Sequence, residues 1–150
     1  MSDTVPDLSI LNAKRPATGI VSGGQPSPTQ IAAAGEAGFR SVLTTRGEGE
    51  IGDYDERGDV ERAGMVFHEL PIAGMGDLSR KNVQAFATLV DSLPRPLLIH
   101  CGSGNRIGAL FALRAAWLDG ADEETALQRG AETGLTGLAP VIRQLIQREA

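Results

Sequence analysis

Short apolar segments alternate along the chain with longer segments whose apolar residues recur at helical spacing. The short segments are rich in Val, Ile, Leu and Thr, and they predict strands at residues 8–11, 18–22, 40–45, 65–70 and 97–100. The last segment is continuously apolar up to its final histidine, which is typical of a strand buried on both faces. Strands that alternate with helices predict a mostly parallel sheet with helices on both sides.

Helix boundaries are marked by capping residues and glycines. Ser27 followed by Pro28 predicts an N-cap and first-turn proline, and Ser79 predicts a second N-cap. Gly38 and Gly64 are expected to end helices. The expected helices cover residues 29–37, 56–63, 80–93, a segment up to about 119, 122–132, and a final segment after Thr136.

Length and composition limit the classes of function. A chain of 150 residues without an internal linker is expected to form one domain, residues 1–150. Its net charge of −5 and pI near 5.0 disfavour a nucleic-acid partner. One cysteine excludes an internal disulfide, and with only two histidines we expect no metal site and no cofactor. Without a signal segment or a long apolar run, a cytoplasmic location and no membrane contact are expected.

The chain's only cysteine lies in a glycine-rich loop between a predicted strand and a predicted helix. The loop is His100, Cys101, Gly102, Ser103, Gly104, Asn105 and Arg106. Backbone N–H groups at a helix start converge on one point, and the helix dipole adds positive potential there. Arg106 adds a planar guanidinium that suits an oxyanion. We therefore expect the Cys101 thiol to ionise readily and to act as a nucleophile toward phosphoryl or sulfur-containing anions.

These residues resemble a known family. The Cys-x-x-Gly-x-Arg loop after Leu-Leu-Ile-His is similar to the signature of the protein tyrosine phosphatase superfamily. The segments 22–28 and 38–43, and Arg46 before an acidic loop, resemble the bacterial beta-lactamase-hydrolase-like phosphatase domain, from about residue 18 to 118. The resemblance implies an α/β three-layer sandwich with a central, mostly parallel, four- or five-stranded sheet.

The resemblance also implies roles for individual residues. Cys101 would be the nucleophile, and Arg106 with the loop residues Gly102, Ser103, Gly104 and Asn105 would hold the substrate oxygens. His100 would order the loop. Arg46 would contact substrate at the cleft rim, and Gln25 would either do the same or fix its turn. Asp77 is the carboxylate of the loop expected to carry the general acid, although Gly74 stands nearer the usual position; otherwise Asp77 only supports the helix that follows Ser79.

Two features depart from the phosphatase signature. Only four residues separate Cys101 from Arg106, where five are usual, and Ile107 replaces the usual Ser or Thr. The short spacing resembles rhodanese sulfurtransferases. The favoured hypothesis is a cysteine-dependent phosphatase that hydrolyses phosphate monoesters through a thiophosphoryl enzyme. The alternatives are a sulfurtransferase using a Cys101 persulfide and a non-catalytic phosphate-binding module.

The expected partners follow from these hypotheses. They are a small molecule bearing phosphate or sulfane sulfur, or a phosphoprotein. The acidic residues that precede and open the second predicted helix are expected to be solvated and to carry no chemistry: Glu48, Glu50, Asp53, Asp55 and Glu56.

Overall fold

A five-stranded sheet forms the centre of the protein. The computed structural model describes residues 8–46, 55–102 and 104–148. The strand order is β1-β2-β5-β3-β4, where β1 pairs antiparallel with β2 and the other pairs are parallel. This confirms the expected mostly parallel sheet. The strands are Lys14–Ala17 (β1), Ile20–Gly23 (β2), Ser41–Thr44 (β3), Val66–Glu69 (β4) and Leu97–His100 (β5).

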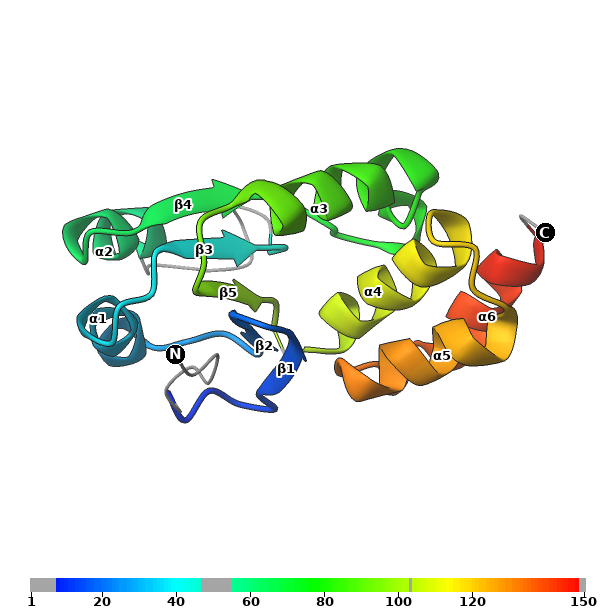
Figure 1. Ribbon diagram of the computed structural model, residues 1–150, viewed down its shortest axis with the longest axis horizontal. Coiled ribbons are helices and arrows are strands. Elements are labelled where there is room, and N and C mark those ends of the chain that lie inside the picture. Colours follow the sequence, from blue (N-terminus) through cyan, green and yellow to red (C-terminus); the bar gives the residue numbers. More distant parts are fainter. Residues whose placement is uncertain (1–7, 47–54, 103, 149–150) are drawn as a thin grey trace.

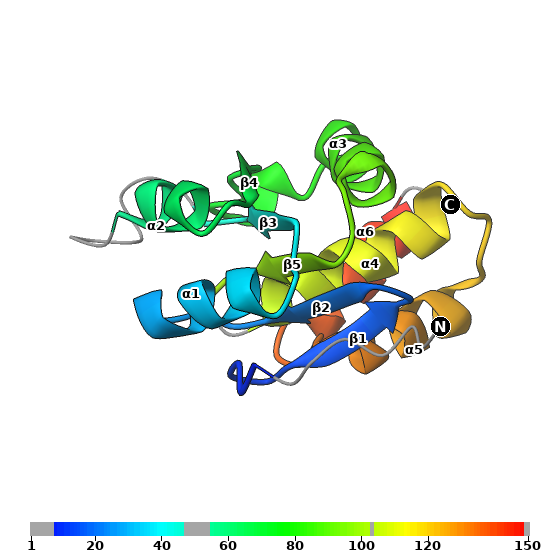
Figure 2. The ribbon, with the colours of Figure 1, turned by 60° about the vertical axis from the view of Figure 1, so that its left-hand side comes forward.

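Helices cover both faces of this sheet, as Figure 1 and Figure 2 show. On one face lie α1 (Pro28–Glu36) and α2 (Glu56–Arg62). The other face carries α3 (Arg80–Ser92), α4 (Asn105–Trp117), α5 (Glu123–Glu132) and α6 (Ala139–Arg148). A short 3₁₀ helix, η2 (Met75–Asp77), precedes α3. The three-layer α/β sandwich is confirmed. No helix in the described ranges is both long and apolar enough to cross a membrane.

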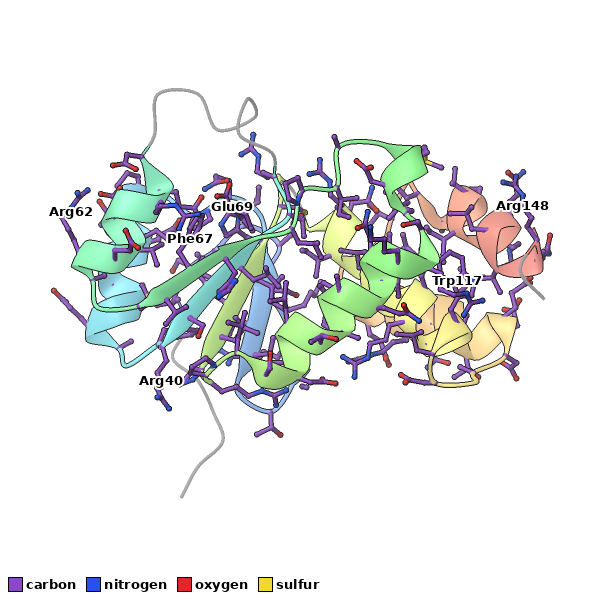
Figure 3. All side chains as sticks on the ribbon, turned by 90° about the horizontal axis from the view of Figure 1, so that it is seen from above. Arg40, Arg62, Phe67, Glu69, Trp117 and Arg148 are labelled. Atoms are coloured by element: carbon purple, nitrogen blue, oxygen red, sulfur yellow. The ribbon has the colours of Figure 1, made fainter. Side chains whose placement is uncertain are left out.

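The central strand β5 separates two apolar cores. Leu97 and Ile99 pack into the core formed with α3 to α6, whereas Leu98 packs into the core formed with α1 and α2. Successive side chains of a strand point to opposite faces, so a strand covered on both sides must be apolar throughout. Figure 3 shows the two sides, with Phe67 toward α1 and α2 and Trp117 among the other helices.

The predicted strand at residues 8–11 is wrong. Ser9 and Asn12 adopt positive φ angles of 58° and 55°, which interrupts an extended strand. The chain turns there, with the N–H of Ala13 donating to the carbonyl of Ile10 at 3.3 Å. The edge strand is instead β1, which contains the charged Lys14 and also Pro16. An edge strand tolerates proline, which lacks a backbone N–H, because only one side of the strand is paired.

The predicted capping residues are confirmed. Ser27 and Gln30 form a reciprocal capping box at α1, with N–H to side-chain oxygen distances of 3.1 and 2.8 Å. Ser79 caps α3 by accepting from the N–H of Asn82 at 3.2 Å. Gly38 follows α1 and Gly64 follows α2, both at positive φ.

Helices α4 and α5 approach each other closely at a pair of glycines. A Cβ atom at Gly108 of α4 would lie 2.1 Å from the backbone N of Leu135 and 2.8 Å from the carbonyl oxygen of Gly130. Both obstacles are backbone atoms, which cannot move without shifting α5 or the turn that follows it. Only glycine, which has no Cβ, therefore fits at position 108 in this packing.

Gly108→Ala should destabilise the protein by about 1–3 kcal/mol or more, because the added methyl group overpacks the α4–α5 contact. Urea unfolding would measure the change in the free energy of unfolding. Gly76→Ala is the matched control, because no atom lies within 4 Å of a Cβ built there. Equal stability of the two variants would contradict the close approach.

Candidate functional site

Cys101 lies directly after β5, at the edge of the sheet where the parallel strands end. Its side chain is buried, and its N–H donates to the carbonyl of Gly23 at the end of β2 at 3.1 Å. On the other side, the N–H of Thr45 after β3 donates to the carbonyl of His100 at 3.0 Å. Three strand ends therefore fix the cysteine at the carboxyl edge, where ligands bind in open α/β sheets.

The loop after Cys101 turns back toward the sulfur. Gly104 has φ 97° and is the N-cap of α4, and its N–H donates to Cys101 Sγ at 3.0 Å. Such a φ strains any residue with a Cβ. The first turn of α4 also leaves backbone N–H groups without intrahelical acceptors, and the helix dipole is positive at this end. The sulfur therefore lies in a region of positive potential.

Arg106 lies in that first turn and reaches across the strand ends. Its Nη1 donates to the carbonyl of Thr45 at 3.0 Å. Arg106 also lines a mostly apolar cavity of about 240 Å³. The other lining residues come from the loop before α3 and from the start of α6: Ile72, Ala73, Gly74, Met75, Leu78 and Leu138. The structure thus joins a cationic group to an apolar cavity.

Side-chain hydrogen bonds connect Gln25 and Arg46 to the base of the loop. Arg46 Nη1 donates to Gln25 Oε1 at 3.0 Å, and Gln25 Nε2 donates to Glu56 Oε1 at 2.9 Å. Glu56 in turn contacts His100 Nε2 through its other carboxylate oxygen. The four side chains therefore form one connected chain, in which Gln25 joins Arg46 to Glu56.

The prediction that Glu56 is a solvated acid is wrong. Glu56 is 2% exposed, because it begins α2 beneath the cysteine loop and pairs with the fully buried His100. A histidine that ends a buried strand requires a polar partner, which was the available signal. Nothing in the local sequence says which carboxylate supplies it. Asp55 instead caps α2, accepting from the N–H of Gly58 at 3.1 Å. The predicted positions of Glu48, Glu50 and Asp53 fall outside the described residues.

Other predicted site residues have structural contacts of their own. Asn105 Oδ1 accepts from the N–H of Thr136 at 2.8 Å, and the carbonyl of Gly102 accepts from the N–H of Gln25 at 3.3 Å. Asp77 Oδ2 accepts from the N–H of Ala73 at 2.8 Å. Ser103 lies outside the described residues.

Residues 17–118 match the family described as "Beta-lactamase hydrolase-like protein, phosphatase-like domain". The chain belongs to this family. The match contains strands β2 to β5 and the last residue of β1, and it contains the whole cysteine loop. Membership confirms the resemblance seen in the sequence and shows a phosphatase-like domain.

Two curated relatives carry the name beta-lactamase hydrolase-like protein. The protein of Xylella fastidiosa (strain Temecula1) is 31% identical over 94 residues, which are 60% of this chain and 22% of the relative. The protein of Agrobacterium fabrum (strain C58) is 26% identical over 131 residues, which are 85% of this chain and 30% of the relative. The chain thus spans less than a third of the length of these relatives.

Solved phosphatase structures share the fold. A candidate phosphatase from Neisseria meningitidis Z2491 has a TM-score of 0.74 at 19% identity, covering 91% of this chain and 97% of its own. Kinase-associated phosphatase has a TM-score of 0.64 at 15% identity, covering 86% of each chain. TpbA of Pseudomonas aeruginosa, solved with phosphotyrosine, has a TM-score of 0.59 at 16% identity, covering 96% of this chain and 94% of its own.

Glu56→Ala should lower the free energy of unfolding by about 3–5 kcal/mol, because it leaves His100 buried without its partner. Urea unfolding followed by circular dichroism would measure this loss. The control is Glu69→Ala, which removes an exposed pair with Arg57 and should cost less than about 1 kcal/mol. A loss at Glu56 no larger than the loss at Glu69 would contradict the buried pair.

Proposed function

We propose that this domain is a cysteine-dependent phosphatase that hydrolyses phosphate monoesters through a thiophosphoryl enzyme. The observation that carries the proposal is the contact of Cys101 Sγ with the N–H of Gly104 at the start of α4. It places a nucleophile beside backbone donors that can also bind phosphate oxygens. Arg106, two residues further along the chain, supplies the planar cation that pairs with the same oxygens.

The reaction proceeds in two displacements at phosphorus. The Cys101 thiolate attacks, a sulfur–phosphorus bond forms, and the bond to the ester oxygen breaks with its electron pair leaving on that oxygen. Water then attacks the thiophosphoryl group, breaks the sulfur–phosphorus bond and regenerates the thiolate with release of phosphate. Arg106 and the loop amides hold the nonbridging oxygens throughout both steps, where negative charge develops.

The cavity beside Arg106 suggests the kind of ester. Its lining is mainly apolar apart from Arg106, and its volume of about 240 Å³ is enough for an aromatic ring. We propose that it receives the apolar leaving group of an aryl phosphate, either a small molecule or a phosphotyrosine side chain. The phosphotyrosine complex of the TpbA structure supports this class of substrate.

An aryl leaving group also fits the surroundings of Asp77. The Asp77 carboxylate already accepts a hydrogen bond from the backbone of its own loop, at Ala73. Aryl oxides depart more easily than alkoxides, because they carry negative charge better. We therefore propose that turnover of aryl esters does not depend on proton donation by Asp77.

A sulfurtransferase is the second candidate, and one observation favours it. Only four residues separate Cys101 from Arg106, so the ring of loop donors is smaller than in the usual phosphatase signature. In this reaction Cys101 takes the sulfane sulfur of thiosulfate, sulfite leaves, and cyanide then removes the sulfur as thiocyanate. This reaction needs no general acid.

A paired assay of one preparation separates these candidates. With an aryl phosphate we expect turnover and a phosphate adduct on Cys101 by intact mass.

Arg106→Lys should lower kcat/KM by roughly 10²–10³, because a point charge cannot replace a bidentate donor. Arg57→Lys, at an exposed arginine paired with Glu69, is the matched control. Thiocyanate formation with a persulfide adduct, and no phosphate release, would establish the sulfurtransferase instead. Phosphate binding without either turnover would indicate a binding module.

Asp77→Asn should change the turnover of aryl phosphates by less than tenfold, since asparagine still accepts from the Ala73 N–H. Steady-state rates with a series of aryl and alkyl phosphates would test this. A loss of roughly 10²–10⁴ that grows as the leaving group becomes more basic would identify Asp77 as the general acid and overturn this part of the proposal.

A further inference from the structure

A second cavity, with a polar lining, lies at the amino ends of the parallel strands, opposite the carboxyl ends where Cys101 lies. Its volume is about 200 Å³. It is bounded by the start of β2 and by the segment before β5, together with parts of α3, α4 and α5. Its charged lining residues are Arg95, Arg114, Arg129, Asp91 and Asp119. The cysteine loop begins α4, whereas Arg114 is near the end of that helix.

The arginines of this cavity are not fully neutralised. Arg114 pairs with Asp91 at 2.9 Å and with Asp119 at 3.8 Å. Within the part of the chain that the structure describes, the acceptors of Arg95 are two backbone carbonyls, those of Thr18 at 2.8 Å and Val90 at 3.4 Å. Among the described residues that line the cavity, three arginines therefore face two carboxylates, in a chain whose net charge is −5.

Arg129 is held differently. Its guanidinium lies 5.0 Å from the centroid of the Phe111 ring, a cation–π contact. Among residues 8–46, 55–102 and 104–148, neither Arg129 nor Arg95 has a carboxylate within ion-pair distance. A stacked guanidinium keeps its N–H edge for a ligand, because the ring contacts only its face.

Arg95 is positioned by the turn before β2. Gly19 has φ 76°, and a Cβ there would lie 3.3 Å from both Cβ and Cδ of Arg95. The side chain therefore packs directly on the glycine backbone, and its guanidinium is anchored by the two carbonyls it contacts. Two arginines held in place beside one cavity lose little further conformational entropy when an anion binds.

We propose that this cavity binds a phosphate-type oxyanion at a site separate from Cys101. Planar guanidinium groups form paired hydrogen bonds with tetrahedral oxyanions, and Arg95 and Arg129 supply two of them. The volume admits phosphate with a small substituent. Asp91 and Asp119 are largely exposed and already engaged by Arg114, so the anion contacts the arginine side of the cavity.

Titration of the isotopically labelled full chain with inorganic phosphate, followed by amide NMR, tests the proposal. We expect two groups of shifted resonances, one at Gly102 and Gly104 and a second at Gly19, Ile20 and Arg129. Arg106→Met should abolish the first group and retain the second. The Arg106→Met variant separates this proposal from the proposed enzymatic function. Loss of the shifts at Gly102 and Gly104 concerns the Cys101 site, whereas loss of the shifts at Gly19, Ile20 and Arg129 concerns the second cavity.

The variants at the second site complete the test. Arg129→Gln and Arg95→Gln should each weaken the second binding event by about tenfold, as expected when one charge-assisted contact is removed. Arg143→Gln is the control, because Arg143 is paired with Glu123 and Glu124 on the protein surface. Acetate at equal concentration should produce smaller shifts. Absence of the second group, equal binding in both cavity variants and the control, or equal binding of acetate would overturn the proposal.

Discussion

The position of β5 between two parallel neighbours is the constraint on which the site depends. The strand is hydrogen-bonded on both sides and buried on both faces, which restricts the movement of its end. His100 and Cys101 are held in the same way, because the hydrogen bonds from Cys101 N–H to Gly23 and from Thr45 N–H to His100 continue the backbone pairing just past the strand. The nucleophile that we propose needs such support, since small misplacements of reacting groups cost large factors in rate.

The hydrogen-bonded chain of Arg46, Gln25, Glu56 and His100, half-buried at Arg46 and Gln25 and buried at Glu56 and His100, supports the loop from the other side. It links the end of β3, the turn after β2, the start of α2 and the end of β5. The hydrogen-bonded partners are 21, 31 and 44 residues apart in sequence. The hydrogen bonds therefore act as tertiary contacts that hold the sheet edge together, in a region where backbone pairing has ended.

Sequence patterns predicted local features well and distant pairings poorly. The caps at Ser27 and Ser79 were predictable because their partners lie three residues away. The strand β5 was predictable because burial on both faces leaves an unmistakable apolar run. Glu56 was not, since its partner is 44 residues away and its sequence neighbours are acidic. The edge strand β1 was not predicted for a related reason. Its pairing with β2 is a tertiary contact that its polar sequence does not reveal.

The two edge strands of the sheet, β1 and β4, each have one side without a neighbouring strand in the described structure, where a strand of a second molecule could pair. Pro16 in β1 has no N–H, and the pairing of β1 with β2 is irregular in register, so this edge offers a poor template for another strand. At the other edge, Arg57 packs over Phe67 and binds Glu69, placing charge along β4. Strand addition from a second molecule is therefore disfavoured at both edges, which protects an open sheet from edge-to-edge pairing without closing it into a barrel.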